Sequence, residues 1–267
     1  MSIQLDRIRT AEALHTILKQ CGSDPQLVRD SHIHLVITTS KPIGIKNDHI
    51  PRIIPLNHCK LSKPSDMRIL LVVKDPSTFY RNSLKADEST AEMFADIISV
   101  KNLKTKYKGS KLNKLFKDYD MVMADYCVHH LLPHILGSAF YKSNRKIPFM
   151  LQMSRQVKKP RTKMVQECDT KYIRAQVRSI CKNTWYVPNP DNCLTVRIGN
   201  VGVHKPDEMT YNIQDIINFL CDKSKRPQGG CIRGGIDSLF IKTSNSTSLP
   251  IYKRAKSTTD MDIVPKL

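Results

Sequence analysis

Two uninterrupted apolar runs in the middle of the chain constrain the fold more than any other feature. Residues 69–73 read Ile-Leu-Leu-Val-Val, and residues 121–124 read Met-Val-Met-Ala. A strand with one face in water alternates polar and apolar side chains. Runs without alternation therefore indicate strands that are buried on both faces, as in a parallel sheet covered by helices. The middle of the chain predicts such a sheet.

Helical patterns separate these strands. Ser89 and Glu92 have the spacing of a capping box, and the apolar residues that follow predict an amphipathic helix through residue 98. Ser110 is expected to cap a second helix, and residues 131–136 predict another that ends near Gly137. With a further strand over 147–151, the order of elements predicts a small parallel α/β unit over about residues 66–151.

The flanking segments have a mixed pattern. They predict helices over 3–20, 172–182 and 208–220, and strands over 31–38, 194–198 and 238–243. Prolines within 50–56 exclude a helix and indicate an edge strand or an extended loop. From about Tyr252 onward we expect a loose tail.

The charge of the chain points to a polyanionic partner. Its formal net charge is +19, an excess that favours binding to nucleic acid or to an anionic surface. Residues 101–117 contain seven lysines and no acid, and residues 151–190 contain nine cations and two acids. In the predicted helix over 172–182, Lys171, Arg174, Arg178 and Lys182 recur at steps of three and four, which indicates a basic stripe. On a less basic chain, a solvated helix face would explain such a stripe.

A polar segment follows the last predicted strand. It consists of Thr243, Ser244, Asn245, Ser246, Thr247 and Ser248, and the cations Lys223, Lys225 and Arg226 precede the strand. Short hydroxyl and amide groups can contact phosphate and ribose oxygens, including the 2′-hydroxyl of RNA. A hydrophilic loop is the alternative interpretation.

Other kinds of site are disfavoured. His130 and His134, near Cys127 and Asp125, have the spacing of zinc ligands on one helix face. Pro133 interrupts that helix and no further ligand is evident, so we expect no metal. The glycines of residues 229–235 lack the Lys-Ser/Thr of a phosphate-binding loop, and no Gly-x-Gly-x-x-Gly follows residue 73. We therefore expect no nucleotide cofactor and no enzymatic activity.

Targeting features are few. The eight cysteines are scattered without a Cys-x-x-Cys pair, as in intracellular proteins with reduced thiols. No apolar run is long enough for a membrane span, and the first ten residues do not read as a secretory signal. Residues 158–161 read Lys-Lys-Pro-Arg, which resembles a short nuclear import signal, although the same cations could contact RNA.

Several segments carry a resemblance to a known family. Residues 41–58 and 242–250, with an α/β unit between them, resemble the ribosomal L-one family, the RNA-binding proteins of the large-subunit stalk. Residues 98–103, 107–112, 124–133 and 222–230 are similar to its non-ribosomal members in pre-ribosomes. The family's Ser-Thr-Met-Gly-Pro signature aligns with residues 246–250, where Ser248 and Leu249 replace Met and Gly.

The resemblance implies a two-domain α/β fold. Its N- and C-terminal segments, residues 1–65 and 152–251, would form one discontinuous RNA-binding domain, a mixed α+β domain. A Rossmann-like parallel domain, residues 66–151, would be inserted between them, and residues 252–267 would be a flexible tail. The expected RNA-binding residues are Lys41, Lys46, Arg52, Lys171, Arg174, Arg178, Lys223, Lys225, Arg226, Thr243, Ser244, Asn245, Ser246, Thr247 and Ser248.

The implied function is that of a non-enzymatic assembly factor. The protein would bind precursor ribosomal RNA in the small-subunit processome, in the nucleolus of the nucleus, beside other ribosome assembly proteins. We expect a monomer within a large ribonucleoprotein, with no cofactor, no metal and no membrane contact. The alternatives are a large-subunit assembly factor or stalk-type protein, and a protein-interaction scaffold that has lost its RNA site.

Overall fold

The computed structural model describes residues 5–28, 30, 32–58, 60–142, 146–157 and 165–255. The chain divides into two compact units. Unit 1 comprises Met1–Ile45 and Asn189–Leu267, and unit 2 comprises Lys46–Pro188. One continuous segment thus forms a unit of its own between two segments that fold together.

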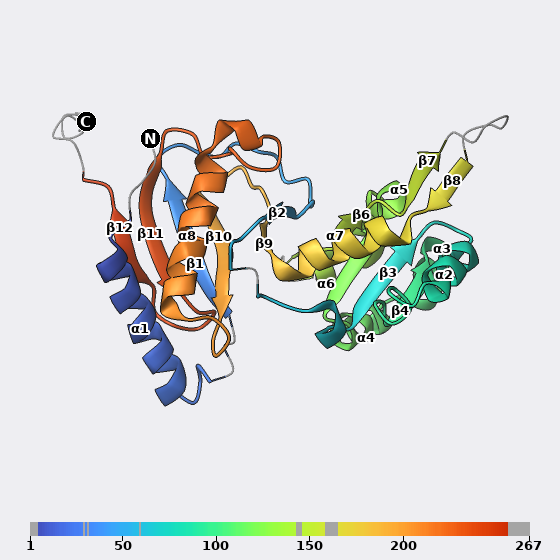
Figure 1. Ribbon diagram of the computed structural model, residues 1–267, viewed down its shortest axis with the longest axis horizontal. Coiled ribbons are helices and arrows are strands. Elements are labelled where there is room, and N and C mark those ends of the chain that lie inside the picture. The colour runs from blue at the N-terminus through green and yellow to red at the C-terminus, as the bar shows by residue number, and fades with distance from the viewer. Residues whose placement is uncertain are drawn as a thin grey trace. The chain divides into compact units, whose positions relative to one another are not determined.

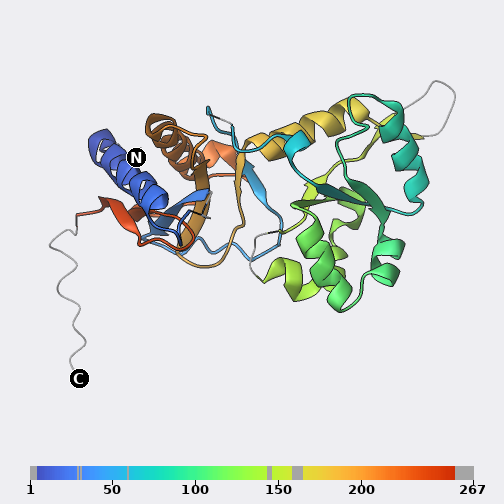
Figure 2. The ribbon, with the colours of Figure 1, turned by 90° about the horizontal axis from the view of Figure 1, so that it is seen from below.

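Unit 1 contains an antiparallel sheet with the strand order β10-β1-β11-β12. Its strands are β1 (His32–Thr39), β10 (Cys193–Asn200), β11 (Ile236–Lys242) and β12 (Leu249–Lys253). Helices α1 (Arg7–Ser23) and α8 (Pro206–Cys221) lie against one face of this sheet, as Figures 1 and 2 show. The other face carries the alternate side chains of the strands.

Alternation along β1 determines which face is buried. Ile33, Leu35 and Ile37 are fully buried, whereas the residues between them are partly exposed. On the helices, buried residues such as Leu14, Ile17 and Ile213 recur at helical spacing and face the same core. In unit 1, the strands expected over 31–38, 194–198 and 238–243 are present, and so are the helices expected over 3–20 and 208–220. Their ends differ from the expected ones by a few residues.

The edge strand β12 includes residues that the sequence pattern assigned to a loose tail. Tyr252 and Lys253 pair with β11, and Ile251 is buried. Pro250 lacks a backbone donor, and an edge strand tolerates this because one of its sides has no partner strand. The short apolar stretch around Ile251 is too brief for a clear periodic signal.

Unit 2 contains the parallel sheet that the apolar runs predicted. Its strand order is β4-β3-β5-β6, and every pairing is parallel. The strands are β3 (Ile69–Val73), β4 (Asp96–Ser99), β5 (Met121–Asp125) and β6 (Phe149–Leu151). All five residues of β3 are buried, which confirms the expected α/β class.

One predicted helix of this unit is wrong. Residues 89–98 form a turn and then strand β4, and the preceding helix is α2 (Ser77–Ala86). The Thr90 hydroxyl donates to the Leu84 carbonyl at 2.7 Å beyond the end of α2. Ile97 and Ile98 belong to the core clusters on opposite faces of the sheet. Successive side chains on opposite faces are the geometry of a strand, not of a helix.

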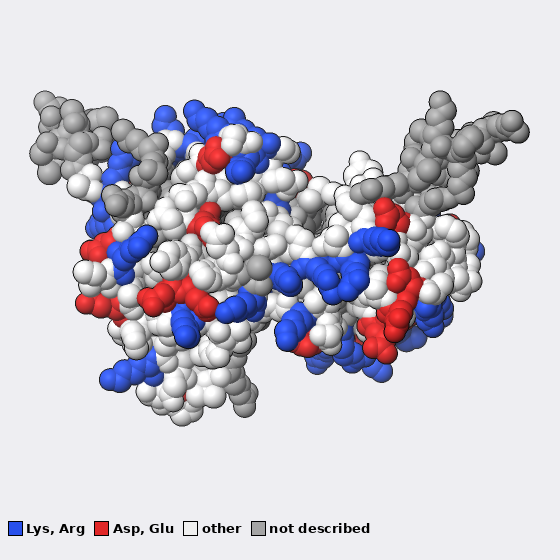
Figure 3. All heavy atoms as spheres, viewed as in Figure 1, with Lys and Arg blue, Asp and Glu red and all other residues white. Residues whose placement is uncertain are grey.

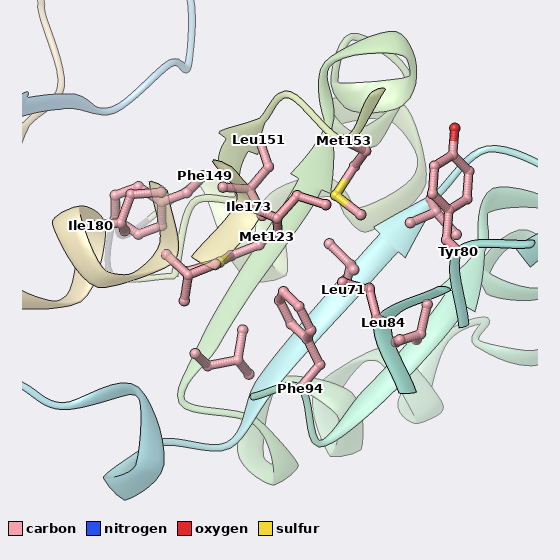
Figure 4. Close-up of a cluster of buried hydrophobic side chains, with 14 of the residues drawn as sticks. Leu71, Tyr80, Leu84, Phe94, Met123, Phe149, Leu151, Met153, Ile173 and Ile180 are labelled. Carbon is pink, nitrogen blue, oxygen red and sulfur yellow. The ribbon is translucent and has the colours of Figure 1, made fainter. Parts of the chain in front are cut away.

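Helices cover both faces of the parallel sheet. One face packs against α3 (Val100–Lys106), α4 (Ser110–Asp118), α5 (Tyr126–His129) and α6 (Leu132–Tyr141). The other face packs against α2 and α7 (Thr170–Lys182). Figure 4 shows Ile173 and Ile180 of α7 among Leu71, Met123 and Phe149 of the sheet.

The packing of α7 gives unit 2 different limits from the expected inserted domain, residues 66–151. Ile173 and Val177 are fully buried in the core of unit 2. The unit also includes the 3₁₀ helix η1 (Pro64–Asp66), the pair formed by β2 (Arg52–Ile54) and β9 (Thr184–Tyr186), and the hairpin of β7 (Ser154–Val157) and β8 (Val165–Cys168). A helix with a broad apolar face must bury it, and here the parallel sheet provides the surface.

Candidate nucleic-acid interface

The polar segment after β11 folds around a carboxylate from the other end of the chain. The Thr243 hydroxyl, which is fully buried, donates to Oδ2 of Asp30 at 2.8 Å. The backbone N–H of Asn245 donates to the same oxygen at 2.9 Å, and its side-chain amide donates to Oδ1 at 3.0 Å. Three donors that the sequence predicted to contact RNA are therefore already hydrogen-bonded to Asp30.

Hydrogen bonds within the segment close it further. The Thr243 N–H donates to the Ser246 hydroxyl at 2.9 Å, and the Ser246 N–H donates to the Thr243 hydroxyl oxygen at 3.0 Å. The exposed side chains of this segment are Ser244, Asn245, Thr247 and Ser248. We call residues 243–248 the hydroxyl tip. Its exposed hydroxyl groups remain able to contact a ligand, whereas Thr243 has a structural role.

A histidine and two cations lie beside the hydroxyl tip on the sheet. His34 of β1 is directly opposite Arg197 on one neighbouring strand and Lys242 on the other. Burial, and then the charges of His32, Arg197 and Lys242, lower the pKa of His34 to about 4. Its imidazole is therefore neutral at pH 7. Sequence reasoning missed His34 and Arg197, because only the strand register places them near the tip.

The expected cations of the C-terminal segment gather at the opposite end of the sheet. Lys223 and Lys225 lie in the 3₁₀ helix η2 (Lys223–Lys225), Arg226 follows it, and all three are exposed. The backbone around them is fixed, since the Arg226 Nε donates to the Gly230 carbonyl at 3.0 Å. Gly230 has a φ of 62°, and a Cβ there would lie 2.6 Å from the Asp222 carbonyl oxygen.

Lys41 lies at this same end. A Cβ on Gly234 would be 2.9 Å from Cγ of Lys41, so the lysine stem packs on that glycine. Arg254 donates to the Ser40 hydroxyl at 3.1 Å. We call Lys41, Lys223, Lys225, Arg226 and Arg254 the cationic end of unit 1. Figure 3 shows Lys and Arg side chains gathered over the end of this unit where η2 lies.

Strand β11 separates the cationic end from the hydroxyl tip. It begins at Ile236, beside the glycines, and ends at Lys242, before the tip. Its seven residues correspond to about 20 Å of extended chain. The structure therefore places the two groups of expected RNA-binding residues at opposite ends of one sheet.

The remaining expected residues belong to unit 2. Lys46 is exposed, and Arg52 in β2 forms an ion pair with Asp48 at 3.2 Å. Lys171 and Arg178 are exposed on α7. Figure 3 shows cations along this helix.

Arg174 of α7 differs from its two neighbours. It is half-buried, and its Nε is buried without a hydrogen-bond partner among the described atoms. Hydrogen bonds from Thr170 and Ser89, and more weakly the charge of Arg174, hold the pKa of Asp87 below its usual value. One cation of the predicted basic stripe, Arg174, therefore interacts with residues of unit 2 and is less available to a ligand than Lys171 and Arg178.

The histidine cluster of residues 125–134 has structural contacts. Asp125 accepts a hydrogen bond from the Cys127 N–H at the start of α5, and His129 Nε2 lies 3.0 Å from the Pro148 carbonyl. Among the described residues, no group of three or more His, Cys, Asp or Glu side chains could hold a metal ion. Within the same part of the chain, no helix has the length and apolar character needed to cross a membrane.

The fold and the sequence together define a protein with a ribosomal L1 domain. The chain belongs to the Ribosomal protein L1p/L10e family, whose model matches residues 17–247. This confirms the expected family and its α/β class.

Three curated relatives illustrate the similarity. The Ribosome biogenesis protein UTP30 of Saccharomyces cerevisiae is 59% identical over 91% of this chain and 88% of its own length. The Putative ribosome biogenesis protein C8F11.04 of Schizosaccharomyces pombe is 26% identical over 82% of this chain and 54% of its own length. The Ribosomal L1 domain-containing protein 1 of Mus musculus is 26% identical over 98% of this chain and 55% of its own length.

Proposed function

We propose that this protein is a non-enzymatic ribosome assembly factor that binds precursor ribosomal RNA in the small-subunit processome. Similarity to UTP30 at 59% identity over nearly the whole chain supports a role in ribosome biogenesis. The protein would act in the nucleolus, beside other assembly proteins, without a cofactor. It would work as a scaffold that holds a folded RNA element.

The observation that carries the RNA-binding part is the cationic end of unit 1. Its lysines and Arg226 are exposed, and glycine-dependent backbone geometry holds the segment in place. Fixed cations on an ordered backbone position a phosphate chain at a smaller entropic cost than cations on a loose tail. The N- and C-terminal segments together would form the RNA-binding domain.

The hydroxyl tip would make a second, smaller contact. Ser244, Thr247 and Ser248 are exposed and can donate to phosphate or ribose oxygens. Lys171 and Arg178 of α7, with Lys46 and Arg52, would add contacts from unit 2. If about six phosphates are neutralised, the logarithm of the affinity should fall against the logarithm of salt concentration with a slope near −5.

One observation favours a different class, a protein-interaction scaffold. The Asp30 carboxylate accepts hydrogen bonds from three donors of the hydroxyl tip, and hydrogen bonds between Thr243 and Ser246 occupy further polar groups. Leu249 stands where the family has glycine, and in β12 it pairs with Ile241 of β11. A protein of this family whose hydroxyl tip has few free donors could still bind protein partners while no longer binding RNA.

Crosslinking in cells, followed by mapping of the contacted transcript, tests the proposal. We expect crosslinks in precursor sequence of the small-subunit RNA, and fewer of them when Lys223, Lys225 and Arg226 are changed to Gln. Crosslinks in large-subunit precursors would instead indicate the large-subunit or stalk-type alternative. Recovery with assembly proteins but without any RNA crosslink would support the scaffold and overturn the RNA-binding proposal.

A further inference from the structure

Unit 2 has a second basic surface, separate from α7. The short helices α3 and α4, with the turn between them, carry seven lysines, and none of the residues from 101 to 117 is acidic. Every one of these lysines is exposed. We call this set the lysine face: Lys101, Lys104, Lys106, Lys108, Lys111, Lys114 and Lys117.

Apolar residues fix the rotation of both helices. Leu103 of α3 and Leu115 of α4 are buried in the core against the parallel sheet, and Leu112 and Phe116 pack beside them. The N-terminus of α3 is held by Asp75, whose carboxylate accepts from the Lys101 N–H at 3.2 Å. Because the apolar stripe must face the sheet, the lysines must point to solvent.

The other exposed side chains of this surface suit a sugar–phosphate backbone. Between the lysines, the exposed side chains of Asn102, Ser110 and Asn113 can donate hydrogen bonds to phosphate and ribose oxygens, whereas the Thr105 hydroxyl donates to its own helix. Among the described residues, the exposed large hydrophobic side chains all lie outside 100–118. Tyr107 and Phe116 are half-buried against the core, so the surface has no fully exposed aromatic platform for unpaired bases.

The same composition disfavours a protein or membrane partner. Protein interfaces are depleted in lysine and are anchored by buried aromatic or arginine side chains, which this surface lacks. Peripheral membrane binding needs apolar side chains on the docking face in addition to cations. A structured RNA needs only a positive surface with hydrogen-bond donors, and it offers phosphates in any sequence.

We propose that unit 2 binds the backbone of structured RNA through the lysine face, independently of unit 1 and without reading the base sequence. The inference rests on the proposed function in one respect, that RNA is the ligand of the protein. It adds a second point of attachment, on the helices that cover the parallel sheet. The two units would then hold one RNA at two places.

The test compares two triple variants of the full chain. One changes Lys104, Lys111 and Lys114 of the lysine face to Gln, which keeps a good helix former at each position. The matched control changes Lys63, Lys85 and Lys142, three exposed lysines elsewhere on unit 2, to Gln. Binding is measured across a salt series to two RNA duplexes of about 20 base pairs with unrelated sequences, and circular dichroism checks the fold.

We expect the lysine-face variant to bind both duplexes about tenfold more weakly, with a salt slope less negative by about 2 to 3. The control should stay within about twofold of the wild type, because scattered lysines neutralise no common phosphate run. Equal affinities and slopes for the two variants would overturn the inference. If the two variants bind RNA equally and the lysine-face variant also fails to bind an acidic protein partner of the wild type, the surface belongs to that protein instead.

The proposed function fails in a different way. If the wild-type chain binds neither duplex nor precursor RNA, both proposals fall. If it binds RNA, and the Lys223, Lys225 and Arg226 variant loses that binding while the lysine-face variant does not, only the inference about unit 2 is wrong.

Discussion

The two ends of the antiparallel sheet in unit 1 differ in how they use their polar residues. At the hydroxyl tip, the Asp30 carboxylate accepts three hydrogen bonds from Thr243 and Asn245. At the cationic end, Lys223, Lys225 and Arg226 are exposed on a tightly folded backbone that contains Gly230. The polar groups of the hydroxyl tip thus bond mainly to one another and to Asp30, whereas the charges of the cationic end face solvent. We infer that the first mainly stabilises the unit and the second mainly attracts a ligand.

The largest effect that follows from this contrast concerns Asp30. Changing Asp30 to Ala removes three hydrogen bonds and leaves the O–H donor of the buried Thr243 without its acceptor. The free energy of unfolding should fall by about 3 kcal/mol, as urea denaturation would measure. Ser244→Ala, an exposed tip substitution, is the control and should be nearly neutral. An Asp30→Ala chain as stable as the wild type would show that the tip is not a closed network.

The next effect concerns pH. The pKa of His34 is about 4 in the folded protein and about 6.5 in an unfolded chain. The unfolded state therefore takes up the proton first as the pH falls, so His34 costs stability progressively from about pH 6.5 to pH 4 and nothing above that range. With allowance for partial exposure, the loss at pH 4 should be about 2 kcal/mol.

His34→Gln isolates this contribution. The variant should show a flatter decline of stability between about pH 6.5 and 4 than the wild type, when both are measured by chemical denaturation. Parallel curves for the two proteins would mean that burial and the neighbouring charges do not lower the pKa of His34.

The smallest effect concerns RNA affinity and compares the two ends directly. Changing Lys223, Lys225 and Arg226 to Gln should weaken RNA binding about tenfold and make the salt slope less negative by about 2 to 3. Changing Ser244, Thr247 and Ser248 to Ala should cost about twofold and leave the slope unchanged, because neutral donors release no counterions. Filter binding over a salt series measures both. A larger loss for the hydroxyl variant would reverse the assignment of the two ends.

Sequence patterns anticipated the core of unit 2 better than its helices. The run of residues 69–73 predicted a strand buried on both faces, and all five residues of β3 are buried. The capping box at Ser89 and Glu92 led to a helix that is absent, because Ile97 and Ile98 can alternate across a sheet as well as follow a helical stripe. Local spacing over so few residues does not separate the two periods.

The sequence supplied candidate RNA-binding residues, but not their arrangement in space. The exposure of Lys223, Lys225 and Arg226 follows from their charge. The role of Asp30 could not be found, because it lies 213 residues from Thr243 in the chain. The cross-strand neighbours of His34 likewise depend on the register of three strands.

The sequence by itself determined the α/β class, the buried strands and the strong positive charge, since these follow from composition and short-range periodicity, and it indicated the family through the resemblance of its motifs. Only the tertiary structure decided that α7 packs on the parallel sheet, that an aspartate closes the hydroxyl tip, and that β11 separates the tip from the cations. The physical reason is that hydrogen bonds and charge fields depend on distance in space. Strand pairing brings together residues that the chain keeps far apart and separates residues that it keeps close.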